Sequence, residues 1–225
     1  MLNLKKLTII ASIIFLLPLN SIQARNMNQN CSLTVIVGSM CSGKTEALIA
    51  AASKFLIANP NLIGIFKPQI DTRVLANNEK DPSIYITSRN GSSIKCIAVA
   101  DVTEIKKIVL EKNYAVVAID EAQFLNKEEL VAFVHEMLAL RKKIIISGLD
   151  LDFRSETFGA MGDLLALADE VIKLTAICTE CGSDTYCITQ RVIDGKPAHY
   201  NDPIIMVGDI EYKPRCRNCH VIRKD

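Results

Sequence analysis

Apolar and polar positions follow two alternating patterns along most of the chain. Short apolar runs rich in β-branched residues are typical of buried strands, and they occupy residues 33–37, 62–66, 97–99, 115–119, 143–147 and 171–174. Stretches with helical spacing separate most of these runs and predict helices over 45–58, 102–110, 127–140 and 158–168. Strands that alternate with helices predict an α/β fold, with a mostly parallel sheet covered by helices on both faces.

Two regions depart from this alternation. Residues 71–93 are polar and rich in turn residues, and only a short strand near 84–87 is expected there. From residue 176 onward the segments are short and polar, and they carry four cysteines in two pairs. We therefore expect one domain over 27–175 and a small lobe over 176–225.

The composition excludes several classes of protein. The chain has 225 residues, with 26 Lys and Arg against 25 Asp and Glu, a net charge of +1 and 49% hydrophobic residues. This is a globular composition, which excludes a disordered or collagen-like chain. The near-zero charge and an aromatic content of only 5% disfavour nucleic-acid binding, which uses basic surfaces and stacking side chains.

A glycine-rich segment, GSMCSGKT, connects the first predicted strand to the first predicted helix. It matches the pattern G-x-x-x-x-G-K-[ST], in which backbone N–H groups and a helix N-terminus surround a phosphate. The lysine of such a loop reaches the β- and γ-phosphates, and the hydroxyl that follows binds Mg²⁺. We predict that ATP is contacted by Gly38, Ser39, Met40, Cys41, Ser42, Gly43, Lys44 and Thr45.

Two acidic residues follow the apolar run over 115–119. Asp120 fits a residue that holds Mg²⁺ directly or through water. Glu121 is expected at the carboxyl edge of the sheet, near the γ-phosphate, where it can act as a base toward water or a substrate hydroxyl. This pattern alone does not distinguish ATP hydrolysis from phosphate transfer.

Residues 1–26 look like a secretory signal. Lys5 and Lys6 precede an apolar stretch over 7–19, and residues 21–24 form a passable cleavage site. The stretch is too short for a comfortable membrane span. The other interpretation is a start at Met27, because export would separate an ATP-dependent enzyme from its substrate. We expect this second interpretation to hold, and with it a cytoplasmic protein.

The two cysteine pairs share the spacing Cys-x-x-Cys, and residues 182–215 separate them. The four residues are Cys178, Cys181, Cys216 and Cys219. Four thiolates match a closed, structural zinc site, which can stabilise a lobe too small to fold on its own apolar core. The alternatives are two disulfides in an exported protein, or a site in which His220 replaces one cysteine.

Eight segments occur in the order seen in the zinc-containing, cellular-type thymidine kinases, which the chain resembles over about residues 33–220. They are GSMCSGKT at 38–45, KPQIDTR at 67–73, SRNG at 88–91, IDEAQF at 119–124, GLDLDFR at 148–154, KLTAIC at 173–178, TQR at 189–191 and YKPRCRNC at 212–219. The resemblance implies transfer of the ATP γ-phosphate to the 5′-hydroxyl of thymidine, giving dTMP, with Mg²⁺ and a structural Zn²⁺. It also implies a homotetramer, with neither nucleic acid nor a membrane as a partner.

The resemblance further assigns roles to individual residues. Glu121 would be the catalytic base, and the ATP site would include Asp120, Glu121, Ala122 and Gln123. The segment between the cysteine pairs would form a loop that holds the thymine. By motif, the thymidine contacts would be Met40, Leu149, Phe153, Phe158, Thr189, Ile205, Val207 and Tyr212. The alternative is a zinc-containing P-loop ATPase that acts on another substrate.

Overall fold

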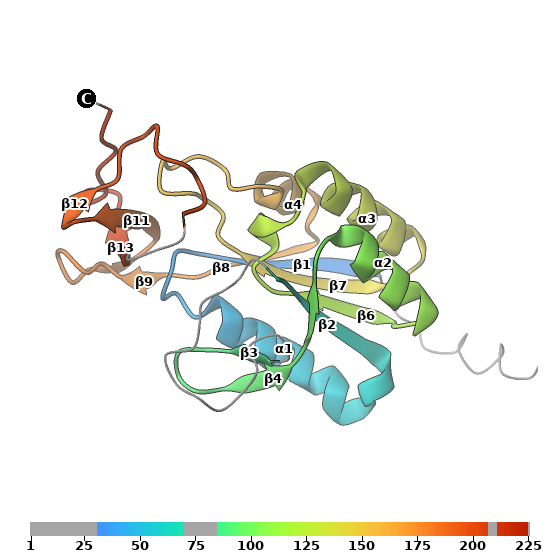
Figure 1. Ribbon diagram of the computed structural model, residues 1–225. Helices are drawn as coiled ribbons and strands as arrows, with labels where there is room; N and C mark the ends of the chain where they lie inside the picture. The colour runs from blue at the N-terminus through green and yellow to red at the C-terminus, as the bar shows by residue number, and fades with distance from the viewer. Residues whose placement is uncertain (1–30, 70–84, 207–210, 225) are drawn as a thin grey trace, which may run out of the picture.

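A six-stranded sheet forms the centre of the computed structural model, which describes residues 31–69, 85–206 and 211–224. Its strands are β1 (Ser32–Val37), β2 (Ile63–Pro68), β5 (Ile97–Val99), β6 (Val116–Ile119), β7 (Lys143–Gly148) and β8 (Glu170–Lys173). They lie in the order β5-β2-β6-β7-β1-β8, and every neighbouring pair is parallel. The predicted α/β fold with a parallel sheet is therefore confirmed (Figure 1).

Helices cover both faces of this sheet. On one face lie α2 (Val102–Glu111), α3 (Lys127–Ala139) and α4 (Met161–Leu167), and on the other lies α1 (Lys44–Ala58). Alternate residues of β6 point to opposite sides, because Val117 and Ile119 pack with the first group and Val116 and Ala118 with α1. An inner strand such as β6 therefore reads as a continuous apolar run, as expected of a sheet buried on both faces, whereas the edge strand β8 is mostly exposed.

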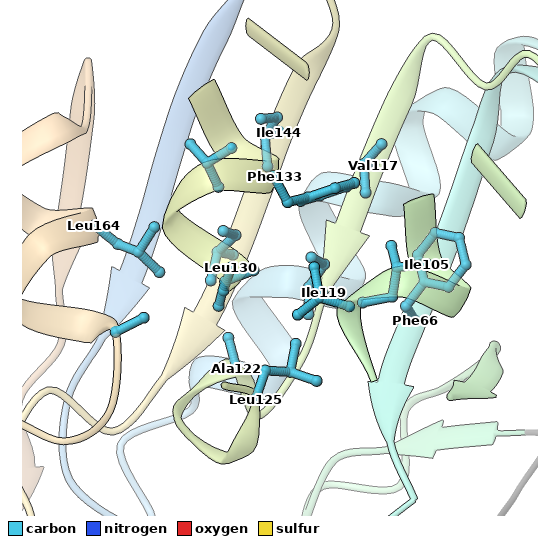
Figure 2. Packing of buried hydrophobic residues seen from close by; sticks show 14 of the residues in the cluster. Phe66, Ile105, Val117, Ile119, Ala122, Leu125, Leu130, Phe133, Ile144 and Leu164 are labelled. Atoms are coloured by element: carbon cyan, nitrogen blue, oxygen red, sulfur yellow. The ribbon is translucent and has the colours of Figure 1, made fainter. Parts of the chain in front are cut away.

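The face that carries α2, α3 and α4 holds the larger apolar cluster. Figure 2 shows Leu130 and Phe133 of α3 lying over Ile119 and Ile144 of the sheet. The side chains of Leu130, Ile119 and Ile144 are completely buried. This packing fixes the position of β6, whose carboxyl end carries the two acidic residues.

Side-chain caps explain where two of the helices begin. The Asp101 carboxylate accepts a hydrogen bond from the backbone N–H of Glu104 (2.9 Å), and the Asn126 side chain accepts one from Glu129 (3.0 Å). Both bonds satisfy backbone donors that an α-helix leaves without a partner. The Asp101 cap agrees with the helix predicted to follow it.

Two elements differ from the sequence-based expectation. The helix expected from residue 158 begins at Met161, because Gly159 has a φ of +54° and the Phe158 N–H bonds to the Asp150 carbonyl at 3.1 Å. A short antiparallel hairpin, β3 (Tyr85–Thr87) and β4 (Ser93–Lys95), packs with α1, although only its first strand was expected. Within the described residues, no helix is both long and apolar enough to cross a membrane.

The described part of the C-terminal lobe forms short antiparallel sheets. Its strands are β9 (Ala176–Ile177), β10 (Asp184–Thr185), β11 (Cys187–Ile193), β12 (Lys196–Pro197) and β13 (Glu211–Cys216). Its separate buried apolar cluster consists of Ala176 and three cysteines, with Cys219 packed against them. Such a cluster is too small to stabilise the lobe alone. Figure 1 shows the lobe beside the end of the main sheet at which β1 continues into α1.

Candidate active site

The loop between β1 and α1 depends on glycine at both ends. A Cβ atom on Gly38 (φ +153°) would lie 2.6 Å from the Ser42 Oγ and 2.9 Å from the Leu174 carbonyl. Gly43 (φ +86°) is the residue before α1, in a left-handed conformation that side chains disfavour. Cys41 also has a positive φ, of 65°. The loop thus has the turned backbone, followed by a helix N-terminus, that a phosphate requires.

Lys44 extends back across this loop. Its side chain is only 6% exposed, and its Nζ donates a hydrogen bond to the Ser39 carbonyl at 2.8 Å. Ser39 itself is buried. The Lys44 ammonium group is therefore held against the backbone of the loop.

The two predicted metal-binding side chains lie together. The Thr45 hydroxyl donates to Asp120 Oδ2 at 3.2 Å, and the Ser147 hydroxyl donates to Asp120 Oδ1. Asp120 is 3% exposed at the carboxyl end of β6. A hydroxyl and a carboxylate in contact form the oxygen donor set that Mg²⁺ prefers, so these residues fit the predicted ion.

Glu121 has an unusual backbone. Its φ and ψ are 53° and 39°, a left-handed conformation that is uncommon for residues other than glycine and recurs at functional sites. Its side chain is 4% exposed and borders the cavity beside the phosphate-binding loop. The Gln123 Nε2 donates a hydrogen bond to Glu121 Oε2 at 2.6 Å. Both Gln123 and Ala122 are buried, and their predicted contact with ATP stays a prediction.

The cavity has a volume of about 210 Å³ and brings the loop, Glu121 and the β3–β4 turn together. It is lined by Met40, Cys41, Gly43, Lys44, Thr45, Glu46, Thr87, Ser88, Arg89, Asn90 and Glu121. The Asn90 side chain donates to Glu46 Oε1 at 2.5 Å, which ties the turn to α1. Residues 87–90 were not predicted as site residues, although the segment SRNG was part of the resemblance.

A second group of predicted residues gathers where the lobe meets the main sheet. The Met40 N–H donates to the Thr189 hydroxyl at 2.9 Å, which joins the phosphate-binding loop to β11. The Arg191 guanidinium lies 4.0 Å from the centre of the Phe153 ring and 5.7 Å from that of Tyr212. The structure thus joins Met40 to Thr189 at the phosphate-binding loop and places Phe153 and Tyr212 around Arg191, two residues further along β11.

The other predicted thymidine contacts are more dispersed. Leu149 is buried and its N–H donates to the Gln123 Oε1 at 3.1 Å. Phe158 is half-buried and packs edge-on against Phe124, with ring centres 5.6 Å apart. Ile205 is 46% exposed, and Val207 lies outside the described residues.

Two arginines hold the loop that precedes residue 207. Arg191 is 1% exposed and donates from its guanidinium to the carbonyls of Pro203 and Ile204. Arg154 donates to the Asp202 carbonyl at 2.7 Å. These contacts were not predicted from sequence. Both arginines nevertheless belong to segments of the resemblance, Arg154 to GLDLDFR and Arg191 to TQR.

A buried carboxylate connects the lobe to the main sheet. The Tyr186 hydroxyl donates to Asp150 Oδ2 at 2.9 Å, and Lys173 lies 3.0 Å from the same oxygen. Asp150 is 4% exposed. Burial, together with the nearby Asp150 charge, raises the pKa of Tyr186, so its hydroxyl is a donor at neutral pH. The ring of Tyr186 also lies beneath Lys173 (4.3 Å) and Arg217 (5.1 Å).

The four predicted metal ligands form one cluster. Their sulfur atoms all lie within 4.8 Å of one another, and those of Cys181 and Cys216 are 3.7 Å apart. Sulfurs bound tetrahedrally to zinc at ~2.3 Å would be ~3.8 Å apart, so the cluster fits Zn²⁺. None of the eight cysteines forms a disulfide, and the cluster contains Cys219 rather than His220.

The environment favours the thiolate at two of the four positions. The hydrogen bond with Ser183 lowers the pKa of Cys181, whereas the hydrogen bond with Cys216 raises that of Cys219. Burial opposes ionisation of Cys178, but hydrogen bonds from the backbone N–H groups of Cys216, Cys181 and Glu180 lower its pKa to about 6. Backbone donors of this kind stabilise a negatively charged sulfur, which is the form that binds metal. The donor set therefore suits a structural zinc ion with no open coordination position.

Comparison with known proteins gives one strong group of matches. The family model for thymidine kinase matches residues 31–220. A thymidine kinase from Coprothermobacter proteolyticus is 45% identical over 197 residues, which cover 87% of this chain and 93% of that protein.

Two solved structures are only weakly similar. The flagellar accessory protein FlaH from Methanocaldococcus jannaschii has a TM-score of 0.44 and 17% identity, and covers 69% of this chain and 76% of its own. Domain III of the replication initiation protein DnaA from Thermotoga maritima has a TM-score of 0.39 and 15% identity. The match covers 69% of this chain and 59% of that chain. Neither similarity bears on function.

Proposed function

The chain belongs to the thymidine kinase family and is an ATP-dependent kinase that phosphorylates thymidine, and we propose that Glu121 is the base of this reaction. The observation that supports the proposal is the position of its carboxylate on the cavity lined by the phosphate-binding loop. A general base has to lie within hydrogen-bond reach of the hydroxyl that attacks. The place of Glu121 on this cavity supports its role as the group that a 5′-hydroxyl would meet beside the γ-phosphate.

Glu121 is the one proton acceptor that the phosphate transfer requires. The 5′ oxygen of thymidine forms a bond to the γ-phosphorus, the bond from that phosphorus to the β–γ bridging oxygen breaks, and ADP leaves. The hydroxyl proton passes to the Glu121 carboxylate. Lys44 and the backbone N–H groups of the loop offset the negative charge on the phosphates.

Thr45 and Asp120 would hold the Mg²⁺ ion that accompanies ATP. The Thr45 hydroxyl oxygen and Asp120 Oδ2 lie 3.2 Å apart at the N-terminus of α1. When bound, the ion neutralises part of the charge of the β- and γ-phosphates. The Ser147 hydroxyl keeps the Asp120 carboxylate in this orientation through its own hydrogen bond.

We propose that the lobe binds the thymine. The Thr189 hydroxyl is bonded to the phosphate-binding loop, and the rings of Phe153 and Tyr212 both lie against the guanidinium of Arg191, two residues further along β11. The backbone near Ile205 follows directly after the carbonyls that Arg191 holds, which gives it a defined position for pairing with the base. The four cysteines, with Zn²⁺ bound, would anchor both ends of this segment and allow it to exclude water from the reaction.

Three further features stay predictions. The resemblance implies a homotetramer, which sedimentation or light scattering of the purified protein would test. The cytoplasmic location and a start at Met27 would be tested by mass spectrometry of the protein's N-terminus and by cell fractionation. A mature chain that begins at Arg25 in an exported fraction would contradict both.

The experiment that tests the base is the substitution Glu121→Gln, which keeps the shape of the side chain and removes its basicity. We expect ATP and thymidine binding by calorimetry to be retained and turnover to fall by about 10²–10⁴-fold. Glu46→Gln is the matched control, because Glu46 is an acid on the same cavity. It should lower turnover by less than about tenfold.

The measurement separates the outcomes. Unchanged turnover in Glu121→Gln would remove this residue as the base. Phosphate released from ATP without thymidine, at the rate seen with thymidine, would instead favour an ATPase.

A further inference from the structure

The Gln123 side chain lies next to Glu121, and both its amide nitrogen and its amide oxygen form hydrogen bonds. It is 3% exposed, its Nε2 donates to Glu121 Oε2 at 2.6 Å, and its Oε1 accepts from the Leu149 N–H at 3.1 Å. Gln123 belongs to a 3-10 turn after β6, η4 (Ala122–Phe124), and Leu149 follows β7. The amide therefore bridges the carboxyl ends of two neighbouring strands of the sheet.

Two glycines leave the space that Gln123 occupies. A Cβ atom on Gly148 would lie 2.7 Å from the Gln123 Oε1, and one on Gly159 would lie 2.5 Å from the Gln123 carbonyl. Gly148 ends β7, and Gly159 precedes α4 with a φ of +54°. Gly148 thus lies against the Gln123 amide and Gly159 against the Gln123 backbone, so two separate parts of the chain pack closely on this residue.

The two hydrogen bonds also fix which way the amide points. The Leu149 N–H can only donate, so the oxygen of the amide has to face it. The NH₂ group then faces Glu121, where it can only donate. A donor held against a carboxylate oxygen restricts rotation of the carboxylate.

We propose that Gln123 is a positioning residue for the base: it holds Oε2 of Glu121 and so fixes the orientation in which the carboxylate meets the 5′-hydroxyl. In the transfer step, the proton of that hydroxyl moves to the Glu121 carboxylate and Gln123 neither gains nor loses one. Because the amide is enclosed by protein, it acts through Glu121 and not through contact with ATP. This inference rests on the proposed role of Glu121.

Two substitutions test the proposal. Gln123→Met keeps the length of the side chain and removes the donor, and we expect kcat to fall by about 10–100-fold while both KM values change less than about threefold. Gln123→Glu keeps the shape but places a second carboxylate beside the first. Two carboxyl groups so close share a proton, so the acidic limb of the kcat–pH profile should move up by about one pH unit or more.

Gln190→Met is the matched control for loss of a buried amide. Gln190 is 2% exposed, its Nε2 donates to the Arg191 carbonyl at 3.3 Å, and its Oε1 accepts from the Val221 N–H at 2.8 Å. It lies in the lobe, so its substitution should lower thermal stability and leave the pH profile of kcat in place. Circular dichroism checks that each variant is folded.

The outcomes are distinguishable. A pH profile in Gln123→Glu that matches the wild type within about 0.3 units, or an unchanged kcat in Gln123→Met, would overturn the proposal. A rise in the ATP KM at constant kcat would overturn it too and would support an ATP contact. If Glu121→Gln itself leaves turnover unchanged, the proposed base fails, and the inference fails with it. A loss with Glu121→Gln and none with Gln123→Met refutes the inference alone.

Discussion

The hydrogen bond from Tyr186 to Asp150 predicts how firmly the lobe is attached to the main sheet. Tyr186→Phe removes one hydroxyl and leaves the ring in place under Lys173 and Arg217. Asp150 is 4% exposed, so its carboxylate cannot recover the lost bond fully from water. Hydrogen bonds to charged groups contribute about 1.5–3 kcal/mol.

We expect the lower end of this range, about 1.5 kcal/mol. The reason is that Lys173 still lies 3.0 Å from Asp150 and Tyr186 is only half-buried. This energy corresponds to a change of about tenfold in the ratio of folded to unfolded protein. For a chain of this size it lowers Tm by about 3–6 °C.

The difference in stability between the wild type and Tyr186→Phe should become smaller at high pH. The pKa of Tyr186 is raised in the folded protein, chiefly by burial and then by Asp150. A raised pKa contributes stability below the unfolded value of about 10 and loses it as pH rises through the folded value. The gap between wild type and Tyr186→Phe should be constant from about pH 7 to pH 9 and shrink above about pH 10.

Urea unfolding followed by circular dichroism measures this free energy. Tyr114→Phe is the control, because the Tyr114 hydroxyl has no hydrogen-bond partner among the described residues. It should change stability by less than about 0.5 kcal/mol. An equal loss in both variants, or a Tyr186→Phe loss below about 0.3 kcal/mol, would refute a role of this bond in holding the lobe.

Two further predictions concern the lobe. Arg191→Met removes the donors that hold the carbonyls of Pro203 and Ile204, so steady-state kinetics should show the thymidine KM raised by about 10-fold or more; an equal rise in the ATP KM would contradict this. Cys181→Ser, or removal of zinc with a chelator, should release the ion in a colorimetric assay and increase hydrogen exchange in β11 and β13. Protection of β6 and β7 should persist, and unfolding of the main sheet at the same metal concentration would show that the lobe is not an independent unit.

The main sheet could be predicted because its signal is local. Strands such as β6 are buried on both faces, so they read as continuous apolar runs whatever surrounds them. The start of α4 could not be predicted, because Phe158 bonds to the distant Asp150 carbonyl instead of beginning a helix. That bond exists only once β7 and the turn before α4 are packed together.

The candidate site likewise has parts that local sequence predicts and parts that depend on packing. The phosphate-binding loop and the cysteine pairs are contiguous motifs whose spacing carries the chemistry. The roles of Arg89 and Asn90 on the cavity depend on how the hairpin packs against α1, which no local pattern encodes. The surroundings of Gln123 depend on Gly148 and Gly159, which sequence alone does not relate to it.

The position of β1 in the sheet has a consequence for biosynthesis. Its two neighbours are β7 and β8, and the Leu33 N–H bonds to an Asp169 carboxylate 136 residues later. At a translation rate of about 5–20 residues per second, that interval is about 7–27 s. The strand that leads into the nucleotide loop is thus made early but waits for both partners, while its apolar side chains stay exposed. A nascent chain of this topology has to remain unaggregated for that period before it can first bind ATP.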